Sequence, residues 1–327
     1  MKKLLFWAGV LISVALLALA LRGLRLDEFA HDLQNANLIW LLPGIALYFV
    51  SVGFRSWRWS LLLRPLGVRL PTRRLFPVVV IGYMGNNVYP ARIGEVLRAW
   101  VLRRNEGVPM SSSLATVGIE RVLDGLLMVA FVVIGLPAVP GLSTQAWPAV
   151  VVALLVFGVA IGIFLWMAHA PAAAERIVNA VAARFFPERF RGGLVNFATR
   201  FIAGAGSLRD PAAAAQIIAA SAITWLIETG KYACVAHAFG LSLPFVGLML
   251  INGVSNLFTV IPGAPGAVGT FDAGGILAAE ALGVEKGLAS AYVLVLHVAL
   301  WLPVTLLGAY FMVRQGVKWA DLGRMED

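Results

Sequence analysis

Three charged residues, Glu120, Arg121 and Asp124, lie within one stretch of five residues in a segment that is otherwise apolar. On insertion scales a charge at the centre of a bilayer costs about 2.5–3.5 kcal/mol, so such residues normally face a partner or a polar cavity. If the segment is helical, Glu120 and Asp124 share one face, and Arg121 can pair with Asp124 one turn further along. One structural ion pair needs only two charges, so the third charge favours a site that binds a charged substrate.

A second charged pair, Glu228 and Lys231, lies in another apolar segment at a spacing of three residues. This spacing places the two side chains on one helix face, where they can pair. We interpret them as a structural ion pair that holds helices together. The alternative is a functional pair that faces a polar cavity.

Two further apolar segments, residues 75–100 and 245–281, are interrupted by the same order of residue types. In each of them asparagine is followed by the pattern P-x-x-x-G and then by an acidic residue. The interrupting residues are Gly85, Pro90 and Gly94 in the first segment, and Pro262, Pro265, Gly266 and Gly269 in the second. Proline removes a backbone donor and glycine weakens a helix, so neither segment is expected to be a continuous helix.

The breaks have a chemical consequence, because a helix N-terminus presents free N–H groups and a dipole that attract anions. In transporters, broken helices at corresponding positions of two inverted halves mark the substrate site. The alternative is that glycine and proline are common in membrane helices generally. Their concentration in two places favours an inverted repeat with a binding site between the breaks.

The polar residues beside the breaks and in the charged segment are the candidate substrate ligands. They are Asn86, Asn87, Arg92, Glu95, Arg98, Glu120, Arg121, Asp124, Asn256 and Asp272. The asparagines would supply neutral hydrogen bonds, and the acidic residues would balance the arginines or carry a coupling proton. Arg92, Glu95 and Arg98 recur along one side of a helix, and their alternative role is that of an ordinary cytoplasmic helix end with snorkelling arginines.

The composition indicates whether these elements fold in water or in a membrane. Hydrophobic residues make up 60% of the chain and charged residues 13%, whereas soluble domains carry about 25% charged residues. The net charge of +9 could indicate a nucleic-acid partner, but in a membrane protein basic residues first serve to orient the cytoplasmic loops. We therefore expect a membrane protein that binds no nucleic acid.

Signatures of catalysis and of cofactor binding are missing from the sequence. There is no phosphate-binding G-x-x-x-x-G-K-[ST] loop, no serine–histidine–aspartate grouping, and no histidine or cysteine at metal-ligand spacing. Cys234 is the single cysteine, so no intrachain disulfide can form. We predict a protein without cofactor or metal that is not itself an enzyme.

Six apolar segments approach the roughly 20 residues that a membrane-spanning helix needs. They cover residues 4–21, 38–54, 116–136, 147–168, 212–239 and 289–313. The first is predicted to be a retained helix rather than a signal peptide, because it is longer than the apolar region of a signal. Residues 172–207 mix apolar residues with arginines and are predicted to form a cytoplasmic amphipathic segment.

The positive-inside rule decides how the interrupted segments cross the membrane. Arginines flank residues 75–100 on both sides, so both ends are cytoplasmic and the segment re-enters as a hairpin. Residues 245–281 then enter from the opposite face. In this arrangement only Arg22, Arg25 and Lys286 lie outside, among 26 basic residues. The predicted fold is an all-α integral membrane protein, a single polytopic domain with six spans and two oppositely oriented re-entrant helical hairpins, with both termini cytoplasmic.

Two local predictions complete this description. Trp57 and Trp59, beside Arg55 and Arg58, are expected to form a belt at the membrane interface, where tryptophan and arginine are common. His297 lies in the last apolar span and is expected to form hydrogen bonds inside the bundle.

Three motifs in this order resemble the flippase-like, lysylphosphatidylglycerol synthase transmembrane-region family over nearly the whole chain. The first comprises Gly85-Asn86-Asn87, Pro90-Ala91-Arg92, Gly94-Glu95 and Arg98, the second Glu120-Arg121 and Asp124-Gly125, and the third Ile261-Pro262, Pro265-Gly266, Gly269 and Asp272. Where the third motif has Asp272, the family usually has glutamate. The resemblance implies a prokaryotic inner-membrane protein that handles lipids, with re-entrant helices around a central site and, here, without the soluble synthase half found in some members.

From these observations we predict a lipid flippase that moves an anionic, phosphate-headgroup lipid across the inner membrane without an ATPase of its own. Its partners would be the membrane lipid substrate and a separate lipid-modifying enzyme. The alternatives are a membrane-embedded enzyme, or enzyme subunit, that acts on a lipid-linked substrate, and a scaffold subunit whose polar residues tolerate substitution.

Overall fold

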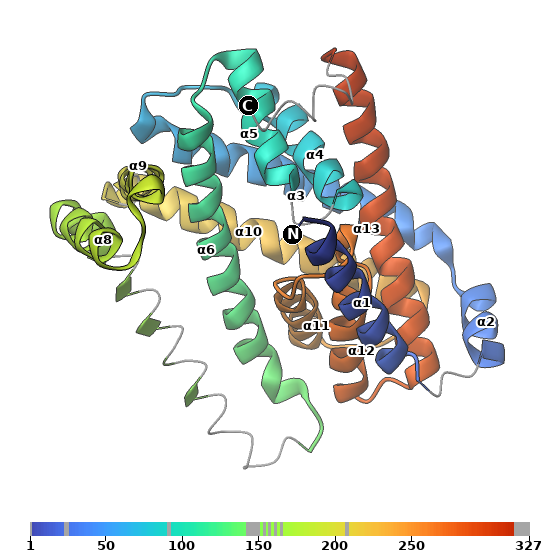
Figure 1. The fold of residues 1–327 in the computed structure, drawn as a ribbon. Helices are drawn as coiled ribbons and strands as arrows, with labels where there is room; N and C mark the ends of the chain where they lie inside the picture. Colours follow the sequence, from blue (N-terminus) through green and yellow to red (C-terminus); the bar gives the residue numbers. More distant parts are fainter. Residues whose placement is uncertain are drawn as a thin grey trace.

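A computed structural model describes residues 2–22, 26–89, 93–141 and most of 151–316. Within the last range it leaves out 153–154, 156–157, 160–161, 164–165 and 207–208. The regular secondary structure of the described residues is entirely helical (Figure 1).

Four long helices frame the molecule. They are α3 (Leu41–Leu63), α6 (Met110–Gly135), α10 (Pro211–Ala238) and α13 (Lys286–Arg314). Helices α3 and α10 pack along each other and run across the view in Figure 1, whereas α6 and α13 run steeply beside them. Among the described residues, three helical segments are long and apolar enough to span a membrane, namely Leu38–Leu66, which contains α3, together with α10 and α13.

A first helical hairpin consists of α4 (Thr72–Val88) and α5 (Ile93–Glu106). Gly85 and Gly94 let the two backbones approach, because a Cβ atom on Gly85 would lie only 2.7 Å from the Gly94 Cα. At the other end of the hairpin, Arg74 Nη1 lies 3.1 Å from Glu106 Oε2, so both open ends are on the same side.

A second hairpin consists of α11 (Phe245–Phe258) and α12 (Thr270–Ala281), joined through the short 3-10 helix η7 (Pro265–Ala267). The break depends on glycine, since Gly266 and Gly269 have φ values of 69° and 85°. Residues with a Cβ atom rarely adopt this conformation. The tip of this hairpin packs against α4, so the tips of the two hairpins meet near the middle of the bundle (Figure 1).

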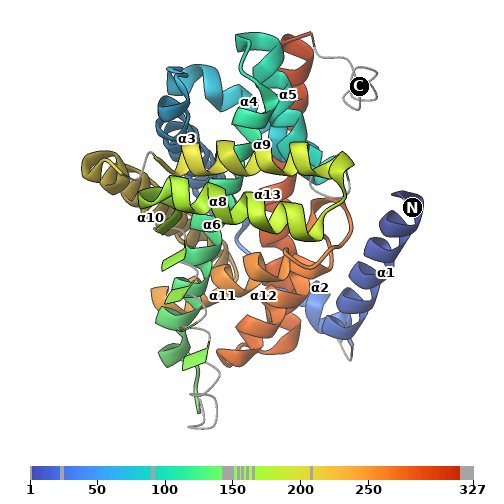
Figure 2. The ribbon, with the colours of Figure 1, turned by 60° about the vertical axis from the view of Figure 1, so that its left-hand side comes forward.

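The remaining helices cover the outside of this core. Helix α1 (Lys2–Ala20) packs on α12, and α2 (Leu26–Asn35) packs on α13. Helices α8 (Pro171–Phe185) and α9 (Glu188–Ala205) lie side by side, and α9 contacts α6 (Figure 2). The predicted span 147–168 falls mostly outside the described residues.

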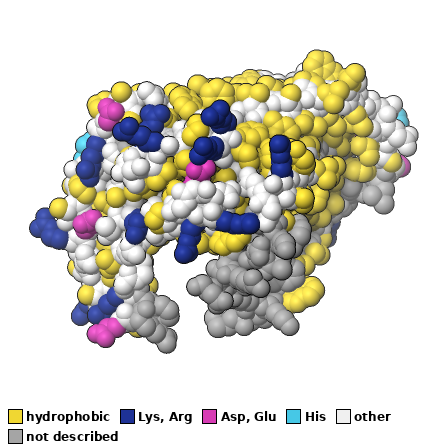
Figure 3. All heavy atoms as spheres, turned by 90° about the horizontal axis from the view of Figure 1, so that it is seen from above, with side chains coloured by type: hydrophobic (Ala, Val, Ile, Leu, Met, Phe, Trp, Pro, Cys, Tyr) yellow, Lys and Arg dark blue, Asp and Glu magenta, His cyan; other side chains and the backbone are white. Residues whose placement is uncertain are grey.

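The surface carries many large apolar side chains. On α13, Val298, Leu302, Leu306 and Val313 follow one another down an exposed face and are 43–74% exposed. Figure 3 shows hydrophobic side chains over much of one face of the molecule, with lysine and arginine gathered in one part of it. Apolar exposure on this scale is expected for helices whose solvent is lipid.

The interfacial belt predicted around Arg55 is wrong. The expected span ended at residue 54, before the first arginine, but the helix continues to Leu63. Arg55, Arg58 and Trp59 are buried, with exposed fractions of 6%, 0% and 0%, so they do not form an interfacial belt. Arg55 and Arg58 point into the bundle because their acidic partners lie on α6 and α10.

Candidate functional site

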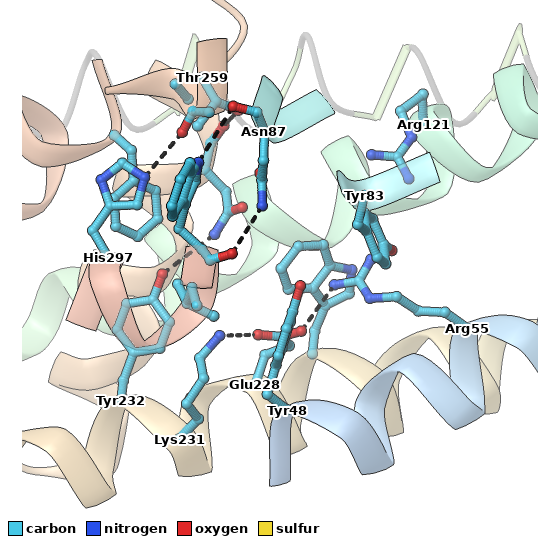
Figure 4. Close-up of a pocket in the computed structure, with 17 residues that line it drawn as sticks. Tyr48, Arg55, Tyr83, Asn87, Arg121, Glu228, Lys231, Tyr232, Thr259 and His297 are labelled. Atoms are coloured by element: carbon cyan, nitrogen blue, oxygen red, sulfur yellow. Dashed lines mark hydrogen bonds and ion pairs between the residues drawn. The ribbon is translucent and has the colours of Figure 1, made fainter. Parts of the chain in front are cut away.

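A cavity of about 190 Å³ opens where the hairpin tips meet the four long helices (Figure 4). Its wall is drawn from α3, α4, α6, α10, α11, η7, α12 and α13. Aromatic and polar side chains dominate the lining, among them Tyr48, Tyr83, Asn87, Tyr232, Asn256 and Trp301. Charged groups also reach the cavity from three of the long helices.

The first charged group in the wall is centred on Glu228 of α10 (Figure 4). Its carboxylate pairs with Lys231, accepts a hydrogen bond from Ser51 Oγ at 2.7 Å, and lies 3.4 Å from Arg55 Nη2. Glu228 and Lys231 therefore do pair as predicted, but the pair is not isolated. Arg55 of α3 is a third charge in the same group.

The second group is centred on Asp124 of α6. Arg58 donates to both of its carboxylate oxygens, at 2.6 and 3.3 Å, and Trp225 Nε1 donates to Oδ1 at 2.9 Å. Arg121 Nη2 and Arg55 Nη1 lie 3.1 and 3.6 Å from Oδ2. Asp124 is thus held by three arginines from two helices, and its predicted pairing with Arg121 is present within that arrangement.

The third group joins α5 to α6. Arg98 Nη1 lies 2.7 Å from Glu120 Oε2, and the Arg98 guanidinium stacks on the ring of Trp59 at 3.5 Å. Arg58 lies 3.7 Å from the other Glu120 oxygen. Arg98 is only 5% exposed, so it does not snorkel to the interface, and for this residue the alternative role considered from the sequence is wrong.

Across these three groups the described residues hold one more positive than negative charge. The cations are Arg55, Arg58, Arg98, Arg121 and Lys231, and the anions are Glu95, Glu120, Asp124 and Glu228. Five cations face four anions, which gives a surplus of +1. The Nε atoms of Arg55 and Arg121 are buried and have no hydrogen-bond partner. The cavity is lined by three of these cations (Arg55, Arg121 and Lys231) and by one of the anions (Glu228), so its wall also carries more positive than negative charge.

The predicted asparagines occupy different environments. Asn87 donates to Thr305 Oγ1 at 2.9 Å and lines the cavity, as does Asn256, which donates to Asn252 Oδ1 at 2.8 Å. Asn86 lies instead against Gly94 of the neighbouring hairpin arm, and its Oδ1 atom is buried without a hydrogen-bond partner.

Asp272 stabilises the second break. Its Oδ2 atom accepts a hydrogen bond from the Gly269 N–H at 2.8 Å, at the N-terminus of α12, and its Oδ1 atom lies 2.7 Å from His297 Nδ1. Asp272 is 1% exposed, whereas His297 reaches the cavity wall. The hydrogen bonding expected of His297 inside the bundle is present, with Asp272 as one partner.

The structure brings together the described charged residues of the first two motifs, namely Glu95, Arg98, Glu120, Arg121 and Asp124. Glu95, at 3.7 Å from Arg121 Nε, belongs to the same cluster. Pro90 and Arg92 lie outside the described residues. Sequence reasoning missed Arg55 and Arg58, although their spacing of three residues within an apolar helix was a usable signal.

The chain is similar to a known family and to known proteins over most of its length. Residues 6–308 match the family described as the lysylphosphatidylglycerol synthase TM region. A protein of Haloferax volcanii named glycosyltransferase AglD is 30% identical over 81% of this chain, and the chain spans 47% of that protein's length. A UPF0104 membrane protein of Methanothermobacter thermautotrophicus is 25% identical over 81% of this chain and 82% of its own length. A third relative, a UPF0104 membrane protein of Pyrococcus horikoshii, is 23% identical over 96% of this chain and 97% of its own length.

Proposed function

Because the chain belongs to the lysylphosphatidylglycerol synthase transmembrane-region family, we propose that it translocates an anionic, phosphate-headgroup lipid across the cytoplasmic membrane of a prokaryote. The observation that carries this proposal is the cavity wall with its surplus positive charge and the guanidinium groups of Arg55 and Arg121. Arginine suits a phosphate because its planar guanidinium group can donate hydrogen bonds to two phosphate oxygens at once.

The size of the cavity fits a headgroup better than a whole lipid. Pockets for drug-sized ligands typically measure about 300–1,000 Å³. At about 190 Å³ this cavity is smaller, so it would hold the headgroup while the acyl chains stay outside, against the apolar helix surfaces. Asn87, Asn256 and the tyrosine rings would contact the neutral part of the headgroup.

We place the two hairpins as re-entrant elements that dip into the membrane from opposite faces. The open ends of α4 and α5 lie on the same side, which supports this arrangement for the first hairpin. Arginine-rich flanks then orient the protein with both termini in the cytoplasm. Arg92, which follows the first break, would approach the headgroup from the hairpin tip.

A second candidate is an enzyme, or a subunit of one, that acts on a lipid-linked substrate. The relative named a glycosyltransferase favours it, although the chain spans only 47% of that protein. In that case a separate lipid-modifying enzyme would be the natural partner of this chain.

The test is translocation by the purified protein in vesicles of phosphatidylcholine that contain a fluorescent phosphatidylglycerol. We expect the label to cross the bilayer several times faster than in protein-free vesicles, with the mass of the lipid unchanged. Rates equal to those of protein-free vesicles would end the proposal. A change in lipid mass that depends on the protein would support the enzyme instead.

A further inference from the structure

His297 lies between two oxygen atoms, one from a carboxyl group and one from a backbone carbonyl. Its Nδ1 atom lies 2.7 Å from Asp272 Oδ1, and its Nε2 atom lies 2.9 Å from the carbonyl oxygen of Gly266. A neutral imidazole carries one N–H, and a carbonyl oxygen can only accept. Both contacts are hydrogen bonds only when His297 and Asp272 together carry two protons, either as imidazolium and carboxylate or as neutral imidazole and carboxylic acid.

The surroundings make this pair a suitable place for an exchangeable proton. Asp272 is buried and fixed by the Gly269 N–H, whereas His297 is 12% exposed at its side chain and lines the cavity (Figure 4). A proton can therefore reach the imidazole through the same space that would receive the headgroup. Histidine is suited to this task because its side chain is the one that most readily gains and loses a proton under physiological conditions.

The pair also connects the two hairpin tips. His297 holds Gly266 of the second tip, and Trp301, one turn further along α13, donates from Nε1 to the Asn87 carbonyl of the first tip at 3.3 Å. Gly266 and Trp301 are themselves in close contact, since a Cβ atom on Gly266 would lie 2.7 Å from Trp301 Nε1. One face of α13 thus carries the contacts to both tips. When the pair loses a proton, one N–H remains on His297; the charged Asp272 carboxylate is the stronger acceptor and holds it on Nδ1, so the bond to Gly266 is lost.

Charged and titratable groups from the neighbouring helices face the same cavity. They are Arg55 and Tyr48 on α3, Tyr83 on α4, Arg121 on α6, and Glu228, Lys231 and Tyr232 on α10. Among the described side chains of helix α2, Phe29 and Leu33 line the groove that it shares with α13. A proton on His297 adds to a wall that is already positive. An anionic headgroup in the cavity therefore favours that proton.

Resting on the function proposed above, we propose that His297 and Asp272 form a proton-binding site that couples headgroup translocation to proton movement. Linkage is reciprocal: if the anion increases the affinity for the proton, the proton increases the affinity for the anion by the same factor. Proton and lipid would then bind together, with the hairpin tips joined, and leave together once the bond to Gly266 is lost.

The first test imposes a pH gradient on the phosphatidylglycerol vesicles. We expect the wild-type rate to rise several-fold when the compartment from which the lipid departs is acidified. The variant His297→Gln, which cannot titrate, should show no response to the gradient, whereas the control His237→Gln, at an exposed position, should respond like the wild type. A wild-type rate that ignores the gradient would overturn the coupling while leaving translocation intact.

The second test needs no transport. NMR of the wild-type protein with nitrogen-labelled histidine reports how many ring nitrogens of His297 carry a proton, once its signal is assigned by its absence from the spectrum of His297→Gln. Adding phosphatidylglycerol should move this titration to higher pH. If the protein moves no lipid but this shift is present, the proposed function fails and the proton site stands. A His297 signal that does not titrate, or that is unchanged by the lipid, would refute the site.

Discussion

At the scale of single residues, the charged groups divide into those that are fully enclosed and those that reach the cavity. Arg58 is 0% exposed and donates to both oxygens of Asp124, so its role is to fix helix positions. Arg121 is different, because its side chain is 33% exposed and lines the cavity. A substrate could approach Arg121 without breaking the enclosed pairs.

Replacing Arg121 by lysine should impair translocation of phosphatidylglycerol without unfolding the protein. Lysine keeps the charge near Asp124 but loses the planar fork that matches a phosphate. The measurement is the vesicle rate together with the thermal midpoint. Arg184→Lys, on the surface helix α8, is the matched control and should keep the wild-type rate. If both variants move lipid equally well, Arg121 does not bind the headgroup.

Glu228→Ala should lower the free energy of unfolding by about 3–5 kcal/mol, because it leaves the buried Lys231 without its partner. Replacing both residues by leucine should recover a large part of that loss, since no orphan charge then remains. Arg55 keeps its contact with Asp124 in both variants. Thermal or denaturant unfolding in detergent gives the comparison. A double variant as unstable as the single one would show that the pair is not merely structural.

At the scale of the elements, the two hairpins depend on close backbone contacts that only glycine permits. Gly85→Ala would place a Cβ atom 2.7 Å from Gly94 Cα and push α4 away from α5. We expect a loss of about 1–3 kcal/mol in stability, the usual range for overpacking, measured by unfolding in detergent. Gly125→Ala in α6, which has open space around its Cβ position, should be neutral or stabilising. Equal effects of the two variants would contradict the packing described for the hairpin.

The sequence predicted contacts between residues of one helix but not contacts between residues of different helices. Local spacing identifies partners on one helix, so the contacts of Arg121 with Asp124 and of Lys231 with Glu228 were predictable. Arg58 and Asp124 are 66 positions apart, and no spacing rule relates them. An arginine inside an apolar helix was therefore taken as the end of the span rather than as a residue with a distant partner.

At the scale of the whole molecule, the proposed topology assigns both ends of the first hairpin to the cytoplasm. Single cysteines near Arg69 and near Arg103, introduced after Cys234 is replaced by serine, should both react with an impermeant reagent added from the cytoplasmic side. Cysteines near Leu241 and near Val284, beyond the ends of α10 and α12, should react from the outside. A cytoplasmic label at only one of the first two positions would rule out re-entry.

The central claim is that the surplus positive charge of the cavity selects an anionic headgroup. The most direct measurement places phosphatidylglycerol and phosphatidylcholine, carrying distinguishable fluorescent labels, in the same vesicles and follows both with the wild-type protein. The account predicts that phosphatidylglycerol crosses several times faster, and that the preference shrinks in Arg121→Gln, which removes one positive charge from the cavity wall. Equal rates for the two lipids, or faster movement of phosphatidylcholine, would contradict it.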